Sequence, residues 1–499
     1  MATAKKQANW AASGPEKRPQ KPLRLSPKGI RQAFATVIGV SALMSTASHA
    51  QSQCPNPVPV TIAAPNLDPQ TATKVPADVC TPVQIPGGNP IAYFDDYSWT
   101  AFIALVWPAM AGQRGTPDPG QTIAKDDLPL VFETYKADWE TFQPGGATPS
   151  AWSDASAPSL PCPNAKAGDF ILSSFTKFGN VGEAGIGTLT AILIAENGTF
   201  VRYLAAYNQT EFQAILTNKW FLAANLPGPG ASLTFPDGAM DVKSAWIDMT
   251  NVPHPERYHT RTAWLQDPIS GTCSTTPVTV GLVGLHIVQK TSSRPQWIWS
   301  TFEQVDNVPP PNYVPPQPPA KPTQTFTFND GTATKMLPAL PAAYVWSNAI
   351  QSPPPPINIQ RLTPINDDPN VSRNTVATNA IWRQALSQKN SVWQFYQLTM
   401  TQWPTATPPN PTLAGTPGNT FPGTGASSAF ANTTLETWDQ TAIRAGCMNC
   451  HTQTQNHDFV WSLSMNAFSP PPIAGRVAVP PSPAIEALKG ILAKQLSPQ

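Results

Sequence analysis

Hydrophobic positions alternate or cluster in short runs through the middle of the chain, which predicts β-strands there. Four such runs, rich in β-branched and aromatic residues, form two consecutive pairs: 189–195, 199–206, 278–290 and 296–302. Asn197-Gly198 separates the first pair and is typical of a two-residue hairpin turn. Asp330-Gly331 is a similar turn signal between 326–328 and 332–334.

Apolar residues at helical spacing predict helices on both sides of this strand-rich part. They are expected over 97–107 (ending before Pro108), 131–142, 208–220 and 374–402, and from Ser482 onward. Asn208 with Glu211 resembles a capping box for the 208–220 helix. A second capping box, Thr433-Thr434-Leu435-Glu436, predicts a helix that runs into Cys447. Asp95-Asp96 is interpreted as the solvated start of the first helix.

Together these elements predict an α+β protein. A strand-rich mixed domain is expected over 51–350, a proline-rich connector over 351–373 and a mainly helical region over 374–499. The chain has 499 residues, of which 59 are proline, 20 phenylalanine and 16 tryptophan. The aromatic residues supply the apolar bulk for a core, and the prolines predict long, stiff loops rather than a disordered chain.

The first fifty residues are typical of an export signal. Eight lysines and arginines precede an apolar run at 33–44, and Ser48-His49-Ala50 places small residues where a signal peptidase reads them. The alternative is a leader that stays attached as a membrane anchor, but the run is shorter than the ~20 residues that a span needs. We therefore expect cleavage of 1–50 and a periplasmic or secreted bacterial protein with no membrane span.

The charge balance argues against nucleic acid as a partner. The whole chain carries a net charge of +1, and removal of the leader leaves 23 basic and 29 acidic residues, a net charge of −6. A mildly acidic protein is not attracted to phosphate backbones or to anionic lipids.

Four of the six cysteines are expected to form disulfides. An exported protein is folded under oxidising conditions, and four cysteines allow three pairings. We favour Cys54–Cys80, which closes a short proline-rich loop, together with Cys162–Cys273, which joins two strand-rich regions. The alternative is four free thiols.

The other two cysteines belong to Cys447-Met448-Asn449-Cys450-His451, a C-x-x-C-H sequence. On a helical turn, positions i, i+3 and i+4 share a face, so two thiols there can each form a thioether with a haem vinyl group. His451 then projects toward the iron as the proximal ligand. A redox disulfide would require a βαβ context and a zinc site a second Cys/His pair, and the sequence shows neither. The motif therefore predicts one covalent haem c.

The segment Thr433–Gly446 and the C-x-x-C-H sequence after it resemble the haem-attachment motif of the cytochrome c family. The wider chain, with YSWTAFIALVWPA from Tyr97 and VGLVGLHIVQKT from Val280, is similar to large exported bacterial monohaem proteins, which mostly lack an assigned function. In small cytochromes c the motif lies near the N-terminus, whereas only 48 residues follow His451 here. We therefore expect upstream segments, such as 374–402, to form the distal wall of the haem site.

Two methionines are candidates for the sixth iron ligand. Met465 is the nearest downstream methionine outside the motif, and its alternative role is a core residue beside Trp461 and Phe468. Met400 lies on the expected upstream helix, where its spacing fits plain packing equally well.

The histidines outside the motif are weaker candidates. His457 is expected at the surface or beside the haem propionates, and His286 is expected to be a hydrogen-bonded core residue of its strand. His254 and His259 lie five residues apart in a polar loop, where they form at most a weak metal pair.

The state of the sixth coordination position separates the functional hypotheses. If a side chain closes it, the protein is an exported monohaem c-type cytochrome that transfers single electrons to or from a redox partner protein, and this is the function we favour. If it is open, the protein is a periplasmic peroxidase or oxygenase whose large N-terminal domain binds a small-molecule substrate. A third hypothesis is a binding module that docks a redox protein. The sequence shows no catalytic residues for any of them.

Overall fold

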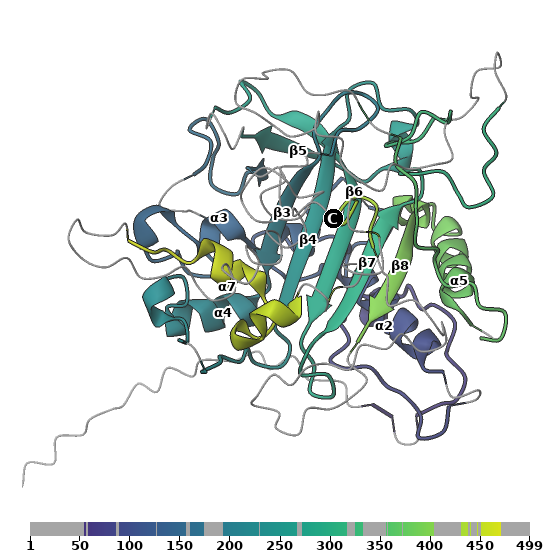
Figure 1. Cartoon of the computed structure of the whole chain (residues 1–499), viewed down its shortest axis with the longest axis horizontal. Coiled ribbons are helices and arrows are strands. Elements are labelled where there is room, and N and C mark those ends of the chain that lie inside the picture. Colours follow the sequence, from purple (N-terminus) through teal and green to yellow (C-terminus); the bar gives the residue numbers. More distant parts are fainter. Residues whose placement is uncertain are drawn as a thin grey trace, which may run out of the picture. The chain divides into compact units, whose positions relative to one another are not determined.

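A single sheet organises the part of the chain that the computed structural model describes (Figure 1). The described residues are 54–55, 58–85, 89–125, 127–155, 160–173, 193–228, 230–266, 272–316, 325–332, 356, 358–371, 373–403, 431–437, 440, 447 and 451–470. All of them belong to one unit, Gln51–Gln499. The expected leader and the helix expected from Ser482 lie outside the described residues.

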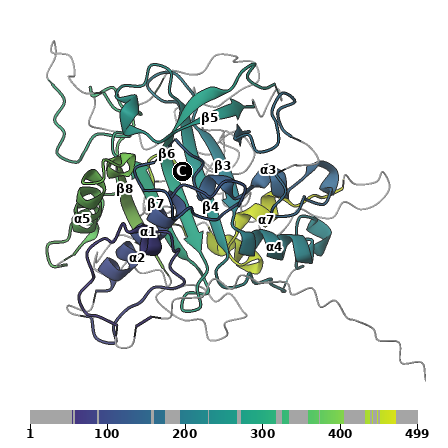
Figure 2. The ribbon, with the colours of Figure 1, turned by 180° about the vertical axis from the view of Figure 1, so that it is seen from behind.

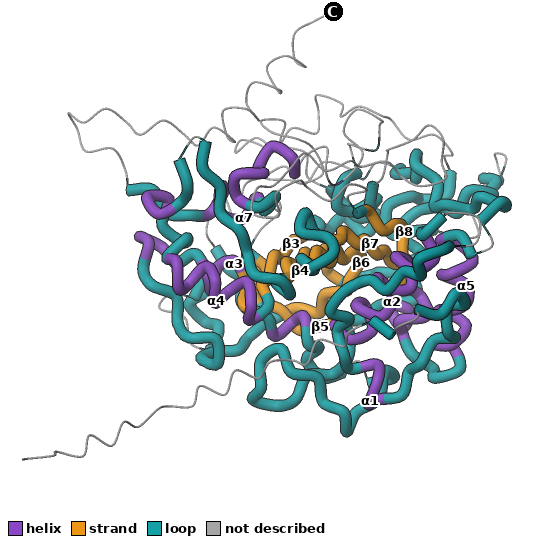
Figure 3. The backbone as a smooth tube through the Cα atoms, turned by 90° about the horizontal axis from the view of Figure 1, so that it is seen from below, coloured by secondary structure: helices purple, strands orange, loops and turns teal. Residues whose placement is uncertain are grey.

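The sheet has a long central strand with neighbours on both sides. Eight strands are described in it: β1 Lys136–Ala137, β2 Ile171–Leu172, β3 Arg202–Tyr207, β4 Met240–Asp248, β5 Thr260–Leu265, β6 Val278–Gln289, β7 Ile298–Gln304 and β8 Tyr396–Gln402. β6 pairs with β4 along one edge, and along the other it pairs first with β5 and then with β7. β-bulges at Ala245/Trp246 and Thr301/Phe302 add local twist, and the sheet curls (Figure 3).

Helices and short turns cover both faces of this sheet. The described helices are α1 Pro69–Ala72, α2 Ile91–Leu105, α3 Asp138–Thr141, α4 Gln209–Asn218, α5 Thr375–Ser387 and α7 Trp461–Asn466, with 3₁₀ turns at 132–134, 144–146, 223–225, 255–257, 392–395 and 452–457. Figure 2 shows α1 and α2 in front of the sheet when it is seen from behind, whereas α7 lies toward the face that is seen in Figure 1.

The α2 side of the sheet holds the largest apolar core. Phe102 of α2 stacks on Phe302 of β7 at 4.2 Å between ring centroids, and Trp99 stacks on Trp382 of α5 at 5.8 Å. The helix expected over 97–107 is confirmed, although it begins at Ile91 and ends at Leu105. Its buried residues lie on almost every side, because β8, β6 and α5 all pack against it.

Asp95 and Asp96 lie within α2, so the interpretation of a solvated helix start is wrong. Asp95 is fully buried and accepts hydrogen bonds from the hydroxyls of Thr375 (2.7 Å) and Thr401 (2.9 Å). Burial raises the pKa of Asp95 to about 7, although both hydrogen bonds act in the opposite direction. Asp96 pairs with Arg373 at 3.0 Å. Both acids therefore join α2 to elements that follow it by almost 300 residues in the chain.

Several predicted elements are confirmed where local signals agree with tertiary contacts. The strands expected over 278–290 and 296–302 are β6 and β7. The 208–220 helix is α4, and the Asn208 side chain accepts from the backbone N–H of Glu211 at 3.0 Å. The other half of the expected capping box is absent, because the Asn208 N–H donates to the Met240 carbonyl rather than to the Glu211 carboxylate. Gly198 has a φ of 79°, which suits the expected turn, and Ile194 pairs with Phe200 across it.

The helix expected over 131–142 is wrong. A 3₁₀ turn at 132–134 is followed by strand β1 and the four-residue helix α3. Lys136 pairs with Tyr207 of β3, so the middle of this amphipathic segment forms an edge strand of the sheet instead of a helix. The hairpin expected around Asp330-Gly331 is described only as a single bridge between Phe326 and Asn329, because 333–334 lie outside the described residues.

The helix expected over 374–402 is correct only in its first half. α5 ends at Ser387, and 396–402 forms β8, which pairs with β7. Mixed α and β structure is confirmed, but the described residues show no separate helical haem region, because β8 belongs to the same sheet as the upstream strands. Met400 is therefore a buried strand residue opposite Thr301.

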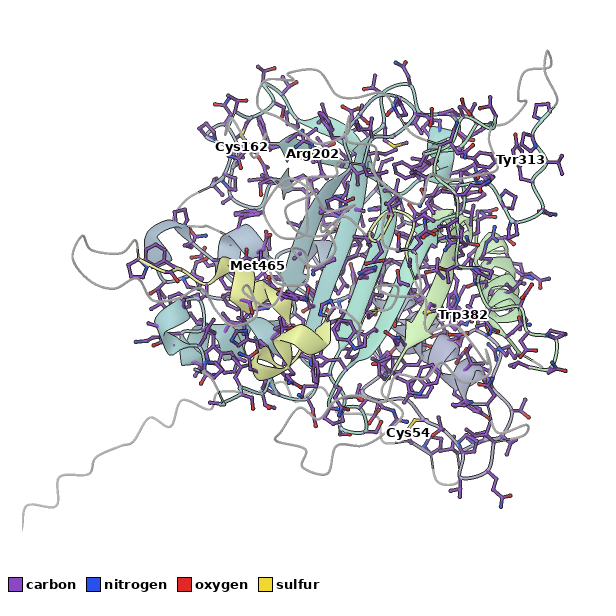
Figure 4. All side chains as sticks on the ribbon, in the orientation of Figure 1. Cys54, Cys162, Arg202, Tyr313, Trp382 and Met465 are labelled. Atoms are coloured by element: carbon purple, nitrogen blue, oxygen red, sulfur yellow. A yellow bond between two sulfur atoms is a disulfide. The ribbon has the colours of Figure 1, made fainter. Side chains whose placement is uncertain are left out.

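The two expected disulfides are present. Cys54 bonds to Cys80 and Cys162 to Cys273, and Figure 4 shows Cys54 and Cys162 far apart in the fold. Such bonds are consistent with a location outside the cytoplasm. Among the described helices, none has the length and hydropathy that crossing a bilayer requires.

The burial of Asp95 predicts a stability that falls as pH rises. Because the pKa is raised to about 7 from 3.8, the folded chain keeps a proton that the unfolded chain loses between these values, so stability is lost through this window. Asp95→Asn is expected to raise the free energy of unfolding at pH 8 by about 1–3 kcal/mol. Urea unfolding at pH 5 and pH 8 measures this, and an unchanged pH dependence in the variant would contradict it.

Candidate functional site

The C-terminal segment that carries the C-x-x-C-H sequence lies on the sheet face opposite α2, and it is held there at two places. The first anchor is 431–437. The Asn432 amide donates to the Thr301 hydroxyl (2.9 Å) and to the Phe302 carbonyl (2.8 Å) of β7. The Tyr203 hydroxyl of β3 donates to the Thr434 carbonyl (2.8 Å). Hydrogen bonds from two strands thus satisfy the buried polar groups of this segment.

Gly284 of β6 allows the first anchor to approach the sheet closely. A Cβ atom at this position would overlap with Thr434 Oγ1 and would lie 3.3 Å from Asn432 Oδ1. The repeated glycines of β6 therefore include one whose missing side chain makes room for the segment.

The turn at 432–436 resembles the expected capping box, shifted by one residue. The side chain of Asn432, rather than Thr433, accepts from the backbone N–H of Thr434 (2.9 Å), and the Glu436 carboxylate accepts from the N–H of Asn432 (2.9 Å). Residues 431–437 form turns, and most of the helix expected to follow lies outside the described residues.

The second anchor is Asp458. Its carboxylate pairs with Lys290, which follows β6, at 2.6 Å and accepts from the backbone N–H of Phe235 at 2.8 Å. Burial raises the pKa of Asp458, while Lys290 favours the ionised form. Removing either member of this buried pair would leave an uncompensated charge.

The described part of the motif packs between these anchors. Cys447 is half-buried against an apolar cluster that includes Tyr207, Trp299 and Leu463. The ring of His451 lies 4.3 Å from the ring of Trp299 of β7, at an angle of 55°. Residues 448–450, and with them Cys450, lie outside the described residues.

The orientation of His451 is set by one backbone carbonyl. His451 Nδ1 lies 2.6 Å from the carbonyl oxygen of Phe459. Because a carbonyl oxygen only accepts, Nδ1 carries the proton, and in a neutral imidazole the lone pair is then on Nε2. Asp458 and Phe459 both have positive φ, 55° and 68°, and this left-handed turn directs the carbonyl back toward His451.

These contacts fit a covalently bound haem. The ligating histidines of metal sites commonly donate their second ring N–H to a carbonyl or carboxylate, and His451 has this arrangement. Cys447 faces apolar side chains, as a thioether to a porphyrin edge requires. Cys447 and His451 are the two motif positions with chemistry that the structure describes, and their role in binding haem stays a prediction.

The candidate sixth ligands are placed differently. Met465 lies on α7 with a half-buried side chain (Figure 4), and its role as a ligand stays a prediction. His457 is almost fully buried, with Nδ1 2.5 Å from the Ser464 hydroxyl, so its expected place at the surface is wrong. Burial lowers the pKa of His457 to about 4, which keeps it neutral. His286 is only half-buried on the sheet face that the segment covers, and its Nε2 lies 3.4 Å from the Glu436 carboxylate without a hydrogen bond among the described residues, so the expected hydrogen-bonded core role is not seen at this atom.

The expected pairing of His254 with His259 is wrong. His254 is exposed, whereas His259 is fully buried with its Nε2 2.7 Å from the Glu133 carboxylate. Within the described ranges, no group of three or more His, Cys, Asp or Glu side chains is placed to bind a metal ion.

Sequence reasoning missed a set of buried ionisable side chains under α7. Glu211 of α4, Asp241 and Lys243 of β4 lie in the interior under α7, and the Ser462 hydroxyl of α7 donates to Asp241 at 3.2 Å. The sequence signal that could have found them is Asp241 and Lys243, two ionisable residues next to apolar ones at the start of β4.

The close approach at Gly284 yields a direct test of the first anchor. Gly284→Ala is expected to lower the free energy of unfolding by about 1–3 kcal/mol, because the new methyl group meets Thr434. Hydrogen exchange of 431–437 should speed up more than that of β4. Gly228→Ala is the matched control, because a Cβ there meets no atom within 4 Å. Equal effects of both substitutions would refute the anchor.

Comparisons with protein-family models, curated proteins and solved structures find no match for this chain.

Proposed function

We propose that this chain is an exported monohaem c-type cytochrome that transfers single electrons. Cys447 and Cys450 hold one haem c through thioethers, and His451 is the proximal iron ligand. The observation that supports this most directly is the 2.6 Å contact between His451 Nδ1 and the Phe459 carbonyl, which puts the lone pair on Nε2. The two disulfides agree with export.

When bound, the haem supplies an iron centre that cycles between two oxidation states. The chain contributes the rest. The Phe459 carbonyl holds a proton on His451 Nδ1 and increases the basicity of the opposite nitrogen. Trp299, which packs on His451, and the apolar cluster around Cys447 would keep water away from these two residues. The anchors at Asn432 and Asp458 fix the motif against the sheet. A redox partner protein exchanges the electron.

Covalent attachment is tested by expressing the full chain in a bacterium that has cytochrome c assembly machinery. Haem should stay with the polypeptide on a denaturing gel and should be absent in Cys447→Ala/Cys450→Ala. Cys54→Ser/Cys80→Ser is the matched control, because it removes the same number of cysteines far from the motif and should keep the haem stain. An unmodified 447–451 peptide in the mass spectrum of the wild type would refute the proposal.

Carbon monoxide separates the carrier from the haem enzyme. A closed carrier is expected not to bind CO in the reduced state, and Met465→Ala should create CO binding if Met465 is the sixth ligand. Met400→Ala is the control, because Met400 is a buried residue of β8. Rapid CO binding by the wild type would instead support a peroxidase or oxygenase with an open site.

A further inference from the structure

A buried pair of carboxyl groups under α7 has no role in the function proposed above. Glu211 is 0% and Asp241 6% exposed. Within the described part of the chain, neither carboxylate oxygen of Glu211 has a hydrogen-bond partner. Asp241 Oδ2 accepts from Ser462, while its Oδ1 has no partner among the same residues. A buried ionised carboxylate without hydrogen bonds is costly, so Glu211 carries a proton.

The titratable groups around Asp241 come from every element that packs on it. These groups, not all of them charged, are Asp138 of α3, Tyr207 of β3, Glu211 of α4, Lys243 of β4, His286 of β6 and, near Glu211, Asp458 beyond the 3₁₀ turn at 452–457. Burial raises the pKa of Asp241, and Lys243 and the hydrogen bond from Ser462 lower it. Lys243 lies close enough to favour the ionised form of Asp241. Among these acids, we single out Asp241 because it is buried, accepts from Ser462 at one oxygen and has a second oxygen without a partner among the described residues, where a proton can be added.

Asp241 is close to the motif through the sheet register. It pairs with Val288 of β6, Val288 pairs with Trp299 of β7, and Trp299 packs on His451 at 4.3 Å. Tyr207 and Phe212, on either side of Glu211 in sequence, belong to the apolar cluster that contacts Cys447. A charge added at the haem site therefore acts on Asp241 through a water-poor interior, where electrostatic effects are weakly screened.

We propose that Asp241 takes up one proton when the haem is reduced and releases it on oxidation; this inference rests on the proposed function. An external one-electron donor supplies the electron, and solvent supplies the proton, which forms an O–H bond on the Asp241 carboxylate. No other bond is made or broken. Glu211 keeps its proton in both states.

The test is the midpoint potential of the haem-loaded full chain between pH 5 and pH 8. The potential should fall as pH rises, by up to about 59 mV per pH unit for one proton per electron. Asp241→Asn should abolish this dependence, whereas Glu211→Gln, which copies the protonated acid, should keep it. Asp95→Asn is the matched control, because it removes a buried acid on the opposite face of the sheet and should also keep the dependence.

Two further measurements guard against variants that fail to mature. Ser462→Ala removes a hydrogen bond that favours the ionised carboxylate, so it should move the pH-dependent range upward. In the wild type, reduction should add the infrared carbonyl band of a protonated carboxyl group, and this band should be missing in Asp241→Asn. A haem-loaded wild type with a potential independent of pH would overturn the inference and leave the cytochrome proposal intact. Loss of the pH dependence in Asp95→Asn or Glu211→Gln would also overturn the inference. Absence of haem from the wild type would overturn the cytochrome proposal itself.

Discussion

The contact between His451 Nδ1 and the Phe459 carbonyl is the interaction on which the candidate site depends. It decides which ring nitrogen carries the proton and therefore which one can bind a metal. The carbonyl reaches the ring because Asp458 and Phe459 adopt a left-handed turn, which costs free energy for residues other than glycine. The Asp458–Lys290 ion pair and the Phe235 N–H hold this turn in place. The residue that follows β6 therefore helps to fix the orientation of the His451 ring.

The sheet supplies the surface on which the C-terminal segment is held. Its face opposite α2 presents polar groups from β3, β7 and the end of β6, and each of these groups is matched by a group of the C-terminal segment. Loss of any one of these contacts would lower the free energy of unfolding by about 1–3 kcal/mol, because a polar atom would then be buried without a partner. This requirement places the segment at one position on the sheet and orients the motif.

Local signals predicted those elements that tertiary contacts reinforce. The Asn208 cap and the β-branched runs of β6 and β7 led to correct elements, because the same residues that favour the local structure also face the core. The 374–402 segment shows where this reasoning fails. Its apolar residues fit helical spacing throughout, yet 396–402 is a strand because β7, almost 100 residues earlier, offers it a free edge. The pairing of a strand with a distant neighbour outweighs its local propensity.

By itself, the sequence favoured the pairing of four cysteines that the structure shows, because an exported protein is expected to be oxidised, although it left the other pairings open. It also determined the mixed α and β character. Only the tertiary structure decided the protonation of the ring of His451, the burial of Asp95 and His457, and the carboxyl pair at Glu211 and Asp241. The physical reason is that desolvation and hydrogen bonding act between segments that are remote in the chain, so the charge state of a side chain is a property of the fold rather than of its neighbours in sequence.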